Sequence, residues 1–287
     1  FCRELNCQAT SNPMMLSGII YAFSPLLSLE GMKSVAFLNR FFLILTIIFL
    51  YLKKFDKFFL IFLIFFPGLI LYSSISIRDT LVIIFSILIF YSFFEKKYLN
   101  FLIIAFLLFL LKYQTAAYIM GISFLYYLFF NIKKKLLFKI IIIISFIIFA
   151  YVLESQITEI LNIKRYGFFH EAYGDLTNFE NLNSMQMILS LPKSALLFFI
   201  SPGPVVNSVY DSIICLDTLI IYMFTFFIFF HNMEIDHNKS FFWLITLIFL
   251  FSLHGLIVIN DGTIHRYKIT ILIPILFAYL YSLKKKF

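Results

Sequence analysis

Residues 241–287 read FFWLITLIFLFSLHGLIVINDGTIHRYKITILIPILFAYLYSLKKKF: two long apolar runs separated by a short polar segment and closed by lysines. Apolar runs of this length with so few charges predict membrane-spanning helices. The polar segment between the runs carries Arg266, whereas the last run ends at Lys284, Lys285 and Lys286. The two ends of one predicted span therefore carry different kinds of cation.

The same pattern continues through most of the chain. Apolar runs end alternately at lysine clusters, which lie at residues 53–57, 95–97 and 133–135, and at polar segments that hold Arg78 and Arg165. Lysine beside a span marks its cytoplasmic side, so we expect the lysine clusters inside and these arginines outside. Arginine on the outer side does not orient a helix, and its presence there needs a functional explanation.

The composition defines the class of protein. The mean hydropathy is +0.97, with 62% hydrophobic and 13% charged residues, whereas charged residues make up about a quarter of a soluble domain. We therefore expect an all-α, polytopic integral membrane protein, because the alternating pattern of a membrane β-barrel is absent. A chain of 287 residues has room for eight to nine spans of about 20 residues each. The net charge of +8 lies mostly in the orienting lysines and does not indicate a nucleic-acid partner.

We expect one membrane domain over residues 1–287, with a long periplasmic loop over residues 154–210. The predicted sides alternate without conflict from residue 35 to the last residue. The chain begins at Phe1 without methionine, which suggests a missing N-terminal segment. Three cysteines without a CxxC pair or a Cys/His cluster predict no metal site.

Arg78 and Asp79 follow one apolar run and precede another with almost no polar interval. A charge at this depth is costly unless it is paired or faces a polar cavity. Arg78 is therefore a candidate ligand-binding cation and Asp79 a candidate catalytic carboxylate. The alternative is a turn in which the two residues pair and Asp79 stabilises the start of the following helix.

Arg165 and Arg266 repeat this outer arginine. The planar guanidinium donates paired hydrogen bonds to phosphate and stays charged, so outer arginines would suit a lipid-linked phosphate or pyrophosphate. Lys112, beside Gln114, is a fourth outer cation that could join such a site. The alternatives are an exposed loop residue at Arg165 and an interfacial side chain at Arg266.

Acid–base candidates lie in the long outer segment. His170 and Glu171 could take a proton from an acceptor hydroxyl, and His265 is a further candidate for the binding site. A loop histidine that is only solvated remains the alternative for His170.

The layout of apolar runs and outer arginines resembles the O-antigen and capsular polysaccharide polymerases of bacterial inner membranes (the Wzy type, including the related EpsG group). The resemblance rests on SIRDTL (residues 76–81), LKYQTAA (residues 111–117), the long outer segment around Arg165, and Arg266 with Tyr267 before the last helix. It covers residues 35–287. Lys112 departs from the pattern, in which histidine or arginine often stands at that position.

The resemblance implies a metal-independent glycosyltransferase of the inner membrane that needs no cofactor. It would transfer a glycan from undecaprenyl pyrophosphate to another lipid-linked repeat unit at the periplasmic face. Arg78, Arg165 and Arg266 would bind the pyrophosphate, and His170 or Glu171 would act as base. The expected partners are this lipid-linked glycan, membrane lipids and a chain-length regulator protein. A flippase or transporter of lipid-linked oligosaccharides and an O-antigen ligase-like glycosyltransferase remain alternatives.

Overall fold

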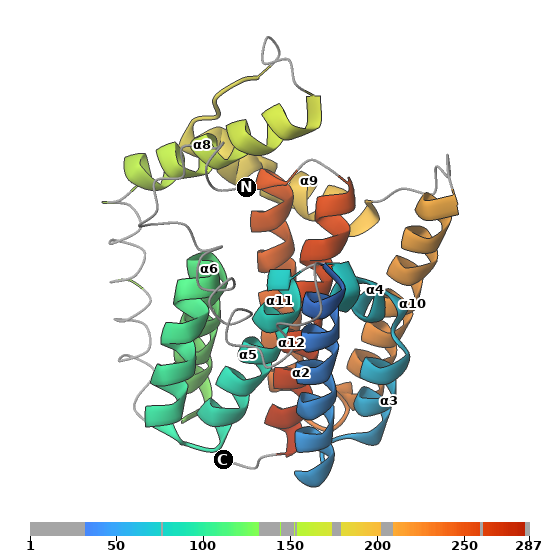
Figure 1. The fold of residues 1–287 in the computed structure, drawn as a ribbon. Coiled ribbons are helices and arrows are strands. Elements are labelled where there is room, and N and C mark those ends of the chain that lie inside the picture. Colours follow the sequence, from blue (N-terminus) through green and yellow to red (C-terminus); the bar gives the residue numbers. More distant parts are fainter. Residues whose placement is uncertain are drawn as a thin grey trace. The chain divides into compact units, whose positions relative to one another are not determined.

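The computed structural model describes residues 32–75, 77–131, 144, 152, 154–173, 179–201, 209–258 and 261–284. They belong to two compact units, the N-terminal unit up to Ser123 and the C-terminal unit from Phe124 on (Figure 1). Within the described ranges the chain is helical or lies in turns and short connections, and no strand occurs there. The predicted all-α class is therefore confirmed for this part of the chain.

Four described helices are long and apolar enough to cross a membrane: Tyr98–Phe130, Ser212–Met233, His237–Ile257 and Gly262–Lys284. A fifth is added if Pro67–Ser73 and Arg78–Phe94, which are bent by 118°, form one broken span. These helices support a multi-pass membrane protein. The expected eight to nine spans are not confirmed, and the apolar runs 14–29 and 136–153 lie almost entirely outside the described residues.

The N-terminal unit contains α2 (Met32–Leu52), α3 (Lys57–Phe65), α4 (Pro67–Ile75), α5 (Ile77–Phe94) and most of α6 (Tyr98–Tyr126). Helix α2 packs against α4 and α5. Pro67 and Gly68 predict a kink in the apolar run 58–77, and the structure interrupts the run there: α3 ends at Phe65 and Phe66 is extended. Pro67 then starts α4, a position where its missing N–H costs no helical hydrogen bond.

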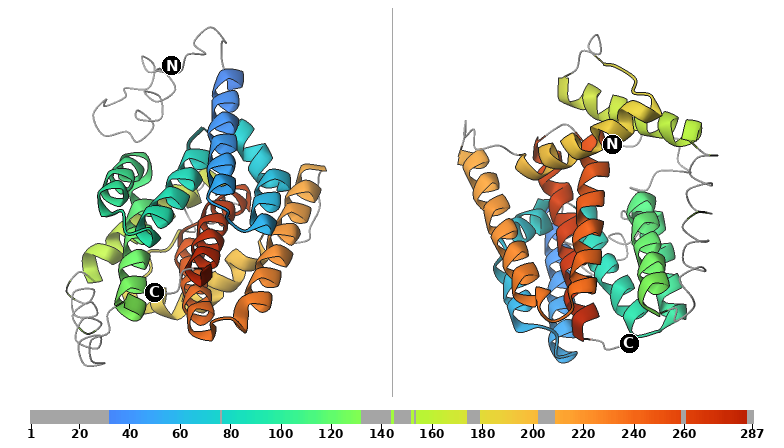
Figure 2. Two further views of the ribbon diagram at one scale, coloured as in Figure 1. Left: turned by 90° about the horizontal axis from the view of Figure 1, so that it is seen from below. Right: turned by 180° about the vertical axis from the view of Figure 1, so that it is seen from behind.

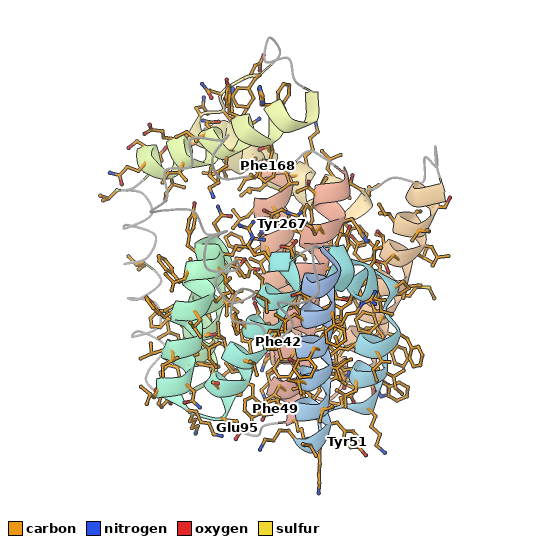
Figure 3. All side chains as sticks on the ribbon, in the orientation of Figure 1. Phe42, Phe49, Tyr51, Glu95, Phe168 and Tyr267 are labelled. Carbon is orange, nitrogen blue, oxygen red and sulfur yellow. The ribbon has the colours of Figure 1, made fainter. Side chains whose placement is uncertain are left out.

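The lysine clusters of the N-terminal unit lie at one end of it, as the sequence predicts. The Phe49 ring of α2 packs 5.0 Å from the Tyr91 ring of α5, and Tyr51 and Glu95 lie at the same end in Figure 3. Both helices finish in the same way, with Lys54 and Lys96 in the left-handed conformation (φ 52° and 58°). We call this end the lysine end of the N-terminal unit. The lysine end of the C-terminal unit is the one that carries Lys284.

The C-terminal unit begins with the last residues of α6 and the π-helical turn η1 (Tyr127–Asn131). It continues with α8 (Glu154–Tyr173), α9 (Ser184–Ile200), α10 (Val209–Met233), α11 (His237–Ile257) and α12 (Asp261–Lys284). Helix α11 packs against α9 and α12. At Gly255 an added Cβ would lie 2.1 Å from the carbonyl oxygen of Ser194, so α9 and α11 approach closely there only because residue 255 has no side chain.

The segment expected as a long outer loop contains helices. Helix α8 lies across the ends of α11 and α12, at the end of the C-terminal unit opposite Lys284 (Figures 1 and 2), and α9 follows it. Residues 261–266, expected as a polar turn, form the beginning of α12. We call this end the arginine end of the C-terminal unit. The arginine end of the N-terminal unit is the one that carries Arg78.

Candidate functional site

Arg78 and Asp79 lie in the first turn of α5. Asp79 is 3% exposed, whereas Arg78 is half-buried. A carboxylate in the first helical turn is stabilised by the unpaired backbone N–H groups and the helix dipole. This position fits the alternative in which Asp79 stabilises the start of the helix, and its burial leaves a reactant little access to the carboxylate.

Lys112 divides α6 into two helical segments. Its backbone is non-helical (φ −157°, ψ 84°), and its side chain is only 7% exposed. In the N-terminal unit the two segments lie side by side (Figures 1 and 2), so the chain reverses at Lys112, where the sequence predicts an outer turn. Tyr98–Phe130, counted above by length and composition, is therefore not one straight helix. The side-chain amide of the neighbouring Gln114 donates to the Tyr113 hydroxyl at 3.3 Å.

His265 is buried in the C-terminal unit between α10 and α12. Its Nε2 lies 2.9 Å from Oδ2 of Asp217, although the contact is not aligned as a hydrogen bond. Its Nδ1 lies 3.0 Å from the Thr218 hydroxyl, which donates to the backbone carbonyl of Ile214. His265 is 1% exposed, so its ring is buried where α12 packs against α10, and its part in a binding site stays a prediction.

Lys268 lies one turn further along α12 and is fully buried, at 0% exposed. Its Nζ donates to the backbone carbonyls of Phe199, at 3.1 Å, and Ser201. These residues stand at the C-terminal end of α9, where carbonyls lack helical partners and the helix dipole favours a cation. The Nζ also lies 5.1 Å from the centre of the Tyr222 ring. The buried charge is therefore held by the end of a helix and an aromatic face.

Arg165 and Arg266 lie in the same region of the C-terminal unit. The Phe168 ring of α8 packs 6.4 Å from the Tyr267 ring of α12 (Figure 3), and Arg165 stands one turn before Phe168. Arg165 Nη1 donates to Asn162 Oδ1 at 3.1 Å and to the Glu180 carbonyl at 3.2 Å. Burial lowers the pKa of Arg165, but a guanidinium remains charged at physiological pH.

The two candidate bases lie next to each other near the end of α8. His170 is exposed and makes no hydrogen bond with any residue that the structure describes. The side chain of Glu171 lies outside the described atoms. His170 is therefore accessible to a reactant, which the proposed role requires.

A groove of about 1070 Å³ runs between α8 and the segment before α9. Its polar lining includes Glu154, Ser155, Thr158, Glu159, Asn181 and Ser184, and the rings of Tyr166 and Phe179 also line it. None of the described residues that line it is a lysine or an arginine. The groove belongs to the C-terminal unit and lies at its arginine end.

Comparison with known proteins identifies no relative. No protein-family model, curated protein or solved structure matches this chain. Within the described ranges, no group of three His, Cys, Asp or Glu side chains could hold a metal ion.

The structure therefore groups the candidate residues in two sets. Arg78, Asp79, Lys112 and Gln114 belong to the N-terminal unit, whereas Arg165, His170, His265 and Arg266 belong to the C-terminal unit. Convergence of all three arginines on one ligand stays a prediction.

Asp217, Lys268 and the groove were not among the features predicted from the sequence. Asp217 interrupts the apolar run 213–230, and Lys268 stands at the start of the run that ends at Lys284. An ionisable residue inside a predicted span is itself a sign of function or of a specific partner. That signal could have identified both residues, whereas the groove depends on contacts between residues about 20 positions apart, such as Asn162 and Leu182.

Proposed function

We propose that this protein is a glycosyltransferase of the bacterial inner membrane that polymerises polysaccharide repeat units. The donor is a glycan linked to undecaprenyl pyrophosphate, and the acceptor is another lipid-linked repeat unit at the periplasmic face. A chain-length regulator protein is an expected partner. The proposal is supported by the sequence resemblance and by the distribution of cations in the two units.

The observation that carries the proposal is the presence of cations at the arginine ends. Arg78 and Lys112 lie there in the N-terminal unit, and Arg165, Arg266 and Lys268 lie there in the C-terminal unit. Cations at the outer ends of spans do not serve orientation, but they suit a substrate whose anionic pyrophosphate sits at the membrane surface. The polar helix α8 at this end of the C-terminal unit suits the sugar part of the same substrate.

In the proposed reaction, the oxygen of the acceptor hydroxyl bonds to the anomeric carbon of the donor glycan. The bond from that carbon to the pyrophosphate oxygen breaks, and its electron pair leaves with the pyrophosphate. His170, or Glu171 next to it, takes the hydroxyl proton. Arg266 and Arg78 stabilise the charge on the departing pyrophosphate. Arg165 adds positive charge from α8, although its Nη1 is engaged by Asn162 and Glu180.

The test is complementation of a deletion strain that makes only single-repeat glycans. Restoration of a glycan ladder by the wild-type gene is expected, whereas Arg78→Ala and Arg266→Ala should leave single repeats at normal expression. Lys57→Ala removes an exposed cation at the lysine end of the N-terminal unit and should restore the full ladder. Normal chain lengths in both arginine variants would refute the proposal.

One observation favours a second candidate, a transporter of lipid-linked glycans. Asp217, His265 and Lys268 are buried within α10 and α12, and ionisable groups inside spans commonly mark transport or proton pathways. A transporter predicts that the deletion strain accumulates lipid-linked repeat units on the cytoplasmic leaflet. A polymerase predicts accumulation of single units on the periplasmic leaflet.

A further inference from the structure

The groove between α8 and residues 179–184 has room for an extended ligand. Small-molecule sites usually have volumes of about 300–1,000 Å³, and this groove has about 1070 Å³. Its size therefore favours a short chain of several rings over a single small molecule.

The walls of the groove are fixed by side chains that hold the backbone. Asn162 Nδ2 donates to the Leu182 carbonyl at 2.8 Å, and the Leu182 N–H donates to Asn162 Oδ1 at 3.1 Å. The Ser184 hydroxyl donates to a carboxylate oxygen of Glu154. These bonds join α8 to the start of α9, so the groove exists before a ligand binds and little ordering cost opposes binding.

An aromatic surface lines one part of the groove. Tyr166 is 45% exposed, and its ring meets the Phe179 ring edge to face at 5.3 Å. The negative face of an aromatic ring attracts positively polarised C–H groups, which sugars present on one face of each ring. An exposed tyrosine held by a second ring is therefore suited to stacking against a sugar.

Several polar groups of the groove are available to a ligand. The side chains of Ser155, Thr158, Glu159 and Asn181 make no hydrogen bond with the parts of the chain that the structure describes. Hydroxyl, amide and carboxylate groups together can donate to and accept from the many hydroxyls of a glycan. This lining matches a hydroxyl-rich ligand better than an apolar one.

The negative charge of the groove lining favours some glycans over others. The described lining contains the carboxylates of Glu154 and Glu159 and no lysine or arginine. Arg165 contacts two lining residues, Asn162 and Phe179, but does not itself line the groove. A uronic acid or another anionic sugar would meet like charge there, whereas a protonated amino sugar would meet opposite charge.

We propose that this groove binds a chain of several sugars without negative charge, with Tyr166 as the stacking surface and Glu159 as the charge selector. Its assignment as the glycan site of the reaction rests on the proposed function, whereas the binding itself does not.

The experiment measures the affinity of the full-length protein, in lipid nanodiscs, for three lipid-free hexasaccharides by saturation-transfer NMR. They consist of glucosamine, N-acetylglucosamine or galacturonic acid, at a mildly acidic pH where glucosamine is protonated. We expect glucosamine to bind most tightly and galacturonic acid most weakly. Tyr166→Ala should weaken the first two about three- to tenfold, and Glu159→Lys should reverse the order of glucosamine and galacturonic acid.

Two matched variants act as controls. Tyr51→Ala removes an exposed tyrosine at the lysine end of the N-terminal unit, and Glu234→Lys makes the same charge change between α10 and α11; neither should alter the affinities. Equal affinity for the three hexasaccharides, no binding of any, or affinities unchanged by Tyr166→Ala would overturn the proposal.

The same variants separate the groove from the proposed function. If the hexasaccharides bind as expected but Arg266→Ala keeps a full glycan ladder in cells, the polymerase proposal fails and the groove stands. If Arg266→Ala abolishes the ladder but hexasaccharide binding does not depend on Tyr166, the groove proposal fails and the polymerase stands.

Discussion

The lysine ends and the arginine ends hold their cations in opposite ways. At the lysine end of the N-terminal unit, Lys53 and Lys97 are exposed and lie over the rings of Phe49 and Tyr91 at 5.9 and 5.8 Å. At the arginine ends, Lys112 and Lys268 are buried. An exposed cation keeps its hydration, whereas a buried cation needs polar partners in the protein.

Exposed and buried cations serve different purposes. Exposed lysines need no particular geometry to orient a span, whereas the two carbonyls at the end of α9 fix the position of Lys268. Lys239 is an exception at the lysine end of the C-terminal unit. It is nearly buried, lies 3.3 Å from Asp236 and donates to the Ser282 carbonyl at 2.9 Å. A buried lysine therefore has specific polar partners at the lysine end as well as at the arginine end.

The largest expected effect is that of removing the buried cation. Lys268→Ala leaves the carbonyls of Phe199 and Ser201 without their donor, and we expect a loss of about 3 kcal/mol in the free energy of unfolding. Lys57→Ala, at an exposed position, should change it by less than about 0.5 kcal/mol. Unfolding in detergent measures both, and equal effects of the two substitutions would remove the distinction between buried and exposed lysines.

A smaller effect is expected at Ser194, where α9 approaches α11. Gly255→Ala places a methyl group against the Ser194 carbonyl, and overpacking of this kind costs about 1–3 kcal/mol. Gly121→Ala in α6 meets open space and should stabilise the protein by up to about 1 kcal/mol. Stabilisation by both substitutions would show that α9 and α11 are less close than described.

The smallest effect concerns the left-handed lysine at the end of α2. Lys54 N–H donates to the Tyr51 carbonyl at 2.9 Å and Phe55 N–H to the Leu50 carbonyl at 3.0 Å, a helix ending that favours glycine. Lys54→Gly should stabilise the protein by about 1 kcal/mol. The backbone of Lys53 is not left-handed, so Lys53→Gly should not stabilise it. The same unfolding measurement applies, and a loss of stability at Lys54→Gly would contradict the strain argument.

The sequence predicts the ends of several helices because charge and hydropathy are local signals. The lysine clusters at residues 53–57 and 95–97 follow α2 and α5 directly, and Lys112 marks the break in α6. The start of α12 was predicted too late, because residues 261–266 are polar. They are helical in the structure, where Asp217 and Thr218 of α10 provide polar contacts for His265.

Some contacts at the arginine end of the C-terminal unit could not be predicted from the sequence. Arg78 and Arg266 were chosen as candidates from their position beside apolar runs, and Arg165 from the long polar segment. The buried partners of Lys268 come from α9, at residues 67 and 69 positions away in the sequence. Contacts of this kind depend on how helices pack, and residue spacing does not encode them. The helical form of residues 154–173 was missed because this segment lacks a strong apolar periodicity.

In the proposed function, cations at the arginine ends bind a pyrophosphate-linked lipid. Native mass spectrometry of the purified protein with undecaprenyl pyrophosphate, and with undecaprenyl monophosphate for comparison, tests it directly. We predict that the wild-type protein and Lys57→Ala prefer the pyrophosphate. Arg266→Ala should weaken its binding at least about tenfold, the loss expected for a charge-assisted hydrogen bond. Equal binding of both lipids by the wild-type protein, or unchanged binding by Arg266→Ala, would contradict the account.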